Sequence, residues 1–167
     1  MRRRNFINQI TALGSLTLTG FPQLACTAPS KYKMGLQLFS VRDAMAEDPL
    51  GTLKKVKAMG YQDFETYGFN PDTKRIYGLE VGEFKLVLDD LGLTTTSGHY
   101  AFSDYFNATE DKLNEFVDQC IEASKILNAP YITWPWVHPD QRNAESFKIL
   151  ADKLNRIGEQ VKGAGLG

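Results

Sequence analysis

Apolar and polar positions along the chain repeat as a unit of apolar strand, polar loop, amphipathic helix and closing glycine. Runs of β-branched and aromatic residues predict strands, whereas apolar residues at three- and four-residue spacing predict helices. Gly60 and Gly92 directly follow two of the helical patterns, where glycine commonly ends a helix. The predicted strands are residues 34–41, 61–66, 93–99 and 131–136, and the predicted apolar helix faces are residues 50–59, 81–91, 113–127 and 147–161.

Strict alternation of strands and helices with short turns predicts right-handed βαβ units and a parallel sheet. The first strand is apolar on both faces, as expected of a parallel strand covered on both sides. The residues that follow it, Phe39 to Asp43, contain no glycine pair, which disfavours a doubly wound nucleotide-binding sheet. We therefore expect an α/β fold, the N-terminal half of a (β/α)8 TIM barrel with four βα units, in which residues 165–167 begin strand five.

The first 26 residues follow a different pattern from the rest of the chain. Arg2-Arg3-Arg4 precedes an uncharged, weakly apolar run from Ile10 to Phe21, and this order predicts an export signal over residues 1–26. The segment Arg3 to Ile7 resembles the twin-arginine motif. The run is shorter than the roughly 20 apolar residues that a membrane span needs. An amphipathic N-terminal helix is the alternative, which the glycines and the proline within the segment disfavour.

Two cysteines stand in different settings and predict no disulfide framework. Cys26 lies where a lipoprotein signal carries its acylated cysteine, but Gln23 replaces the usual large aliphatic residue, so a lipid anchor and simple cleavage both stay open. Cys120 falls at an apolar helix position and is expected to be a buried small hydrophobe. The sequence thus predicts an exported protein, periplasmic or membrane-anchored, with a linker at 27–33 and the partial barrel at 34–167.

Composition narrows the classes of partner. The chain has 167 residues, 43% hydrophobic residues and a formal net charge of -1, which suits one ordinary globular domain. A net charge close to zero argues against nucleic acid as a partner, because binding to phosphates usually needs an excess of basic residues. The chain also lacks a metal-ligand pair at helical spacing, a nucleophile elbow and a phosphate loop, so no catalytic residue and no metal ligand is assigned in it.

Polar side chains at the expected carboxyl ends of the strands are the candidates for a small-molecule site. Glu65 is placed to bind sugar hydroxyls, orient a base or accept a lysine or arginine, and a structural ion pair is the alternative. Asp63, two residues earlier on the same face, fits the packed interior or a partner pairing better. His99 follows Ser97 and Gly98, where the glycine leaves room for a ligand, and suits donation to a substrate oxygen or metal ligation.

Two tryptophans flank Pro135 at the end of the fourth predicted strand. Such aromatic rings stack on a sugar or wall a pocket, and they equally serve as barrel core. Trp134 is preferred over Trp136 for the pocket because it stands directly before the break in the strand. His138, in the following loop, is expected at the surface.

With these residues in view, the sequence resembles the sugar phosphate isomerase/epimerase superfamily with a xylose-isomerase-like barrel. The resemblance is carried by the segments 34–42, 60–65 and 97–99. It implies a divalent metal, manganese or zinc, and proton transfer next to a sugar carbonyl through an enediolate. Glu65 and His99 match first-half positions that line the substrate pocket, and Gln37 and Trp134 are assigned with them to substrate binding.

In this superfamily the metal ligands and acid/base carboxylates come chiefly from strands five to eight, so none is secured by this chain. The resemblance therefore implies an N-terminal fragment of an exported sugar or sugar phosphate isomerase/epimerase that is inactive alone and prone to self-association through open barrel edges. A non-catalytic carbohydrate-binding barrel is the alternative. A type-2 AP endonuclease-like hydrolase, in which a histidine at the strand end of His99 binds zinc, fits poorly with export and near-zero net charge.

Overall fold

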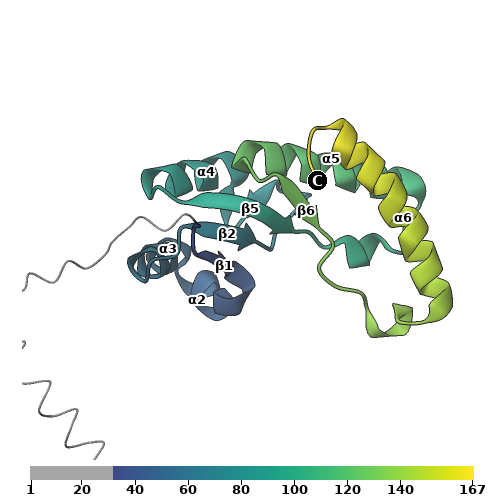
Figure 1. Cartoon of the computed structure of the whole chain (residues 1–167), viewed down its shortest axis with the longest axis horizontal. Helices are drawn as coiled ribbons and strands as arrows, with labels where there is room; N and C mark the ends of the chain where they lie inside the picture. Colours follow the sequence, from purple (N-terminus) through teal and green to yellow (C-terminus); the bar gives the residue numbers. More distant parts are fainter. Residues whose placement is uncertain (1–31) are drawn as a thin grey trace, which may run out of the picture. The chain divides into compact units, whose positions relative to one another are not determined.

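A parallel four-stranded sheet, in the order β1-β2-β5-β6, organises the computed structural model, which describes residues 32–167 (Figure 1). The predicted export signal and Cys26 lie outside the described residues. The strands of this sheet are β1 (Gly35–Gln37), β2 (Asp63–Thr66), β5 (Thr94–His99) and β6 (Tyr131–Thr133), and β3 (Arg75–Ile76) and β4 (Leu79–Glu80) form a separate hairpin. The helices are α2 (Arg42–Glu47), α3 (Pro49–Ala58), α4 (Val81–Asp90), α5 (Glu110–Leu127) and α6 (Ala144–Gly163). The predicted parallel α/β architecture is thereby confirmed.

Local signals in the sequence set the ends of the helices. The Asp48 carboxylate accepts a hydrogen bond from the Gly51 amide at 2.9 Å and caps α3, and Asn143 caps α6 through the Ser146 amide at 3.0 Å. Thr109 caps α5, and its hydroxyl accepts from the Lys112 amide at 3.5 Å. None of the helices within residues 32–167 is both long and apolar enough to cross a membrane.

Helix α5 supplies the largest predicted apolar face, and the structure buries all of it. Burial raises the pKa of the Cys120 thiol, so this residue acts as a small hydrophobe, as predicted. Phe116 stacks on Tyr105 at a centroid distance of 4.0 Å and meets Phe102 edge-on at 5.1 Å. The buried positions of this face are Leu113, Phe116, Val117, Cys120, Ile121, Ser124 and Leu127.

Three predicted elements differ from the structure. The first strand ends at Gln37, and residues 38–41 form a 3-10 helix because the Gln37 side chain accepts a hydrogen bond from the Ser40 amide and turns the chain. Between the predicted strand at 61–66 and the predicted helix face at 81–91, the chain forms the β3–β4 hairpin, which the pattern does not predict. The fourth strand stops at Thr133, two residues before Pro135, which has no N–H to donate to a ladder.

Helix α6 is the longest described helix, with 20 residues against 18 in α5. Only the C-terminal part of its predicted apolar face is buried. Ile157 and Val161 are buried, whereas Phe147 and Leu154 are 49% and 43% exposed. After α6, the Gly167 amide donates to the Pro130 carbonyl at 2.9 Å and the Gly167 carbonyl accepts from the Ile132 amide at 2.8 Å. These two bonds have the pattern of a parallel ladder, so Gly167 pairs with the edge of β6 where the sequence predicts strand five, whereas the amides of residues 165 and 166 still bond back to α6.

Candidate functional site

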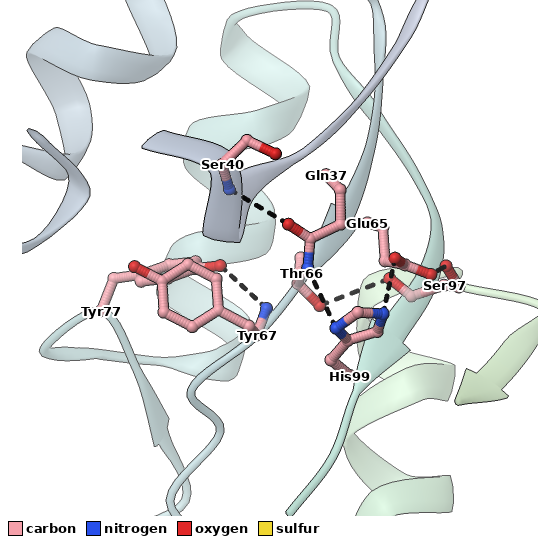
Figure 2. Close-up of polar contacts among 8 residues, drawn as sticks. All are labelled: Gln37, Ser40, Glu65, Thr66, Tyr67, Tyr77, Ser97 and His99. Atoms are coloured by element: carbon pink, nitrogen blue, oxygen red, sulfur yellow. Dashed lines mark hydrogen bonds and ion pairs between the residues drawn. The ribbon is translucent and has the colours of Figure 1, made fainter. Parts of the chain in front are cut away.

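Four polar side chains form a continuous hydrogen-bonded row at the carboxyl ends of β1, β2 and β5 (Figure 2). The Glu65 carboxylate lies 2.6 Å from Nε2 of His99, and Nδ1 of His99 lies 3.0 Å from the Gln37 amide nitrogen. The Ser97 hydroxyl donates to the second oxygen of Glu65. We call these four residues, Gln37, Glu65, Ser97 and His99, the polar row.

The register of the sheet brings the polar row together. Gln37 lies opposite Glu65 in the β1–β2 pair, and Glu65 lies opposite Ser97 in the β2–β5 pair. Asp63 and Phe64 pair with residues 94 and 95, so the register shifts by one residue before Glu65. Side chains alternate along a strand, and an extra residue in one strand reverses which face the later side chains occupy. The bulge therefore turns Ser97 and His99 towards the face that carries Glu65.

Hydrogen bonds set the orientation and the tautomer of His99. The Gln37 carbonyl oxygen accepts from the Ser40 amide at 3.2 Å, so the NH2 group of Gln37 is the part that faces Nδ1 of His99. Nδ1 is then an acceptor, and the ring proton sits on Nε2, which donates to Glu65. The Gln37 side chain thus orients the imidazole so that its Nε2–H points at the carboxylate.

Glu65 keeps capacity for a ligand. Its carboxylate has about four lone-pair positions, and Ser97 and His99 occupy two of them. The side chains of Glu65 and His99 are 27% and 24% exposed, so both remain open to solvent. A partly exposed carboxylate with free lone pairs is suited to hydroxyl groups, which donate to its oxygens.

The described residues do not fit the divalent metal that the resemblance implies. Within residues 32–167, no group of three or more histidine, cysteine, aspartate or glutamate side chains is placed to hold a metal ion. Both ring nitrogens of His99 already have partners, Gln37 and Glu65. A metal ligand must present a free lone pair, so we assign no metal role to His99, and Glu65 has no further ligand-type side chains around it in the described part of the chain to complete a metal site.

Asp63 belongs to a second polar cluster on the same sheet face. Its carboxylate accepts from the Thr94 hydroxyl at 2.6 Å and from the Thr96 hydroxyl, and Lys33 donates to Thr94 at 3.0 Å. The sequence predicted a partner for Asp63 without naming it, and the structure shows that the partners are the hydroxyls of Thr94 and Thr96. Both ends of this sheet face therefore carry polar side chains. The edge strands of the sheet are β1 and β6, and self-association through them stays a prediction.

The space beside Gly98 is filled by the protein itself, which corrects the expectation that it admits a ligand. A Cβ atom on Gly98 would lie 2.7 Å from Cε2 of Tyr100. The Tyr100 hydroxyl is 2.7 Å from the Ser124 hydroxyl in the core, and burial raises the pKa of Tyr100. Gly98 thus allows a buried tyrosine to cross the end of β5, and it does not form part of a pocket.

Trp134 does not contact the polar row. Its ring stacks on Phe102 with centroids 5.3 Å apart, and its indole N–H donates to the Trp136 carbonyl at 2.8 Å. The predicted role of Trp134 in substrate binding therefore stays a prediction. Trp136 is the more open of the two tryptophans, at 46% exposure, and the His138 side chain lies at the surface as expected.

A hollow of about 390 Å³ lies away from the polar row, between the segment after β2, the start of α4 and α5. The Lys74–Glu122 ion pair, 2.8 Å long and exposed, is part of its wall. Two of the charged side chains in this wall, Lys74 and Glu122, are paired with each other. Sequence reasoning had no signal for this hollow because it forms between elements that are distant in the sequence. The polar row at the strand ends therefore remains the candidate site.

Solved structures resemble this chain, whereas no protein-family model and no curated protein matches it. One is a sugar phosphate isomerase/epimerase from Parabacteroides distasonis, with 26% identity and a TM-score of 0.66 over 84% of this chain and 51% of that one. A second sugar phosphate isomerase/epimerase from the same organism has 23% identity and a TM-score of 0.58 over 80% of this chain and 51% of that one. The third is D-psicose 3-epimerase with D-tagatose from Clostridium cellulolyticum, with 14% identity and a TM-score of 0.55 over 81% of this chain and 50% of that one.

This chain spans about half the length of each of these three structures. Together with the parallel sheet, the matches show an α/β fold that corresponds to part of a TIM barrel. The predicted fold class is thereby confirmed. The chain is also similar in structure to sugar isomerases and epimerases, which bears out the resemblance at that level.

Proposed function

We propose that this chain belongs to an exported sugar or sugar phosphate isomerase/epimerase that moves a proton next to a sugar carbonyl. The observation that carries the proposal is the polar row, because it places a carboxylate, an oriented imidazole and an amide at neighbouring carboxyl ends of parallel strands. In TIM barrels this end of the sheet is where active sites form. The structural similarity to sugar epimerases supports the same substrate class.

Each member of the row has a distinct part in this proposal. Glu65 accepts hydrogen bonds from sugar hydroxyls, and Ser97 and His99 hold its carboxylate in place. Gln37 acts through His99 as a positioning residue, because its amide and carbonyl groups are both used within the protein. The divalent metal, manganese or zinc, that would polarise the sugar carbonyl takes its ligands from outside the described residues, so we derive no step through it.

Sugar binding without turnover is the expected behaviour of the purified 167-residue chain. Titration with D-tagatose should shift the ring nitrogen resonances of His99 saturably in NMR spectra, because hydroxyls that bind Glu65 change the acceptor of the His99 N–H. Added Mn²⁺ or Zn²⁺ should produce no ketose interconversion by this chain. Absence of any shift at high D-tagatose concentration would contradict the binding role, and metal-dependent interconversion would contradict the expected inactivity.

Export is the second part of the proposal and rests on residues 1–26. Fractionation of cells that express the protein should place it outside the cytoplasm, with the signal removed or with Cys26 lipidated. Replacing the paired Arg3 and Arg4 by lysines should retain the protein in the cytoplasm, because twin-arginine signals are recognised through the arginines. A cytoplasmic wild-type product with intact residues 1–26 would refute export.

A further inference from the structure

An exposed aromatic ring with two basic neighbours stands on the segment between β6 and α6. Trp136 is 46% exposed, and the guanidinium carbon of Arg142 lies over its ring, 5.2 Å from the centroid. The His138 ring meets the same indole edge-on, with centroids 4.5 Å apart. Three side chains that the polar row does not use therefore meet at one surface point.

Hydrogen bonds hold this segment in one conformation. The Trp136 carbonyl accepts from the Trp134 indole N–H at 2.8 Å and from the Ser103 hydroxyl. The Arg142 Nε–H donates to the Val137 carbonyl at 2.9 Å, which fixes the plane of the guanidinium. A basic group whose position is set in advance loses little conformational entropy when a ligand binds.

The cation of Arg142 has no acidic partner among residues 32–167. Its single side-chain hydrogen bond there uses Nε, which leaves the two terminal NH2 groups without a protein acceptor. Arg42 also lies over an aromatic ring, that of Phe39 at 4.9 Å, but Asp43 is 3.8 Å from it. Arg142 thus presents a free planar fork, the geometry that binds phosphate oxygens in pairs. His138 contacts the same indole, and its Nε2 atom lies 3.4 Å from the Asp104 carboxylate.

We propose that Trp136, His138 and Arg142 bind the phosphate group of a phosphorylated sugar. This inference rests on the proposed function, which leaves sugars and sugar phosphates open, and it selects sugar phosphates as the substrate class. The segment leaves the carboxyl end of β6, which is the neighbour of β5, and Thr133 there lies opposite His99 (Figure 1). In this proposal the sugar contacts the polar row and its phosphate contacts Arg142. The Trp136 ring packs against the guanidinium of Arg142.

Comparison of three ligands by isothermal titration tests the proposal on the 167-residue chain: D-tagatose, D-tagatose 6-phosphate and inorganic phosphate. The phosphorylated sugar should bind about tenfold more tightly than D-tagatose, as expected for a charge-assisted hydrogen-bonded pair. Arg142→Leu should reduce that ratio to about one and leave the affinity for D-tagatose unchanged. Arg142→Lys keeps the charge but loses the planar fork, so it should give an intermediate ratio.

Arg75→Leu is the matched control, because the Arg75 guanidinium also bonds a backbone carbonyl, that of Gly78 at 2.9 Å, and has no ion pair among the described residues. It should leave the ratio unchanged, and an equal loss in this variant would overturn the site in favour of general charge attraction. Equal binding of both sugars by the wild type would overturn the phosphate site and leave the sugar function standing. Phosphate binding that depends on Arg142, without D-tagatose binding, would support the phosphate site and contradict the proposed function.

Discussion

Replacing Glu65 by glutamine is expected to lower the affinity for D-tagatose at least about tenfold, with little loss of stability. Glutamine keeps the shape of the side chain but exchanges one acceptor oxygen for an NH2 donor. His99 and Ser97 both donate to this carboxylate, so one of them then faces a donor and the row loses its order. Calorimetric titration measures the affinity, and thermal unfolding monitors the fold. In an enzyme that contains this segment, sugar turnover should fall more than stability.

Asp63→Asn is the matched control for this substitution. It makes the same change of carboxylate to amide two residues earlier on β2, where the partners are the hydroxyls of Thr94 and Thr96. Because these threonines donate to Asp63 at the far end of the strand, the affinity for D-tagatose should stay within about twofold of the wild type. Equal affinity in Glu65→Gln and the wild type would remove Glu65 from the site.

Placing alanine at Gly98 should destabilise the fold by about 1–3 kcal/mol, although alanine loses less backbone entropy than glycine on folding. The added Cβ would lie 2.7 Å from the ring of Tyr100, closer than nonbonded carbon atoms approach. The ring would have to move, which would weaken the 2.7 Å contact between the Tyr100 hydroxyl and the buried Ser124 hydroxyl on α5. Urea unfolding at constant pH measures this change through the transition midpoint.

Gly35→Ala is the control for Gly98→Ala, because Gly35 also lies in a strand of the same sheet. A Cβ there would meet only the Asp63 carbonyl oxygen, at 3.7 Å, an ordinary contact distance. The substitution should be neutral or stabilising by up to about 1 kcal/mol, since it restricts the unfolded chain. Similar losses at both positions would show that strand flexibility, and not the Tyr100 ring, makes Gly98 necessary.

Much of the fold was predictable from local patterns. The apolar face of α5 is buried at every predicted position, and Asp48 and Asn143 cap the helices they precede. These features depend on residues within a few turns of one another, so periodicity and capping chemistry are sufficient to find them. The alternation of strands and helices likewise predicted the parallel sheet, and the strand-end positions of Glu65 and His99 marked the side where the polar row forms.

What only the tertiary structure decided depends on contacts between distant segments. Strict alternation from Thr94 would place His99 on the face opposite Glu65, and the bulge in β5 reverses this. The room beside Gly98 looked open in the sequence, whereas in the fold the Tyr100 ring fills it and the Tyr100 hydroxyl contacts Ser124 in the distant α5. The sequence by itself therefore determined the elements and their order, since these follow from local periodicity. The tertiary structure decided which polar side chains meet, since register and packing arise only when separate strands and helices come together.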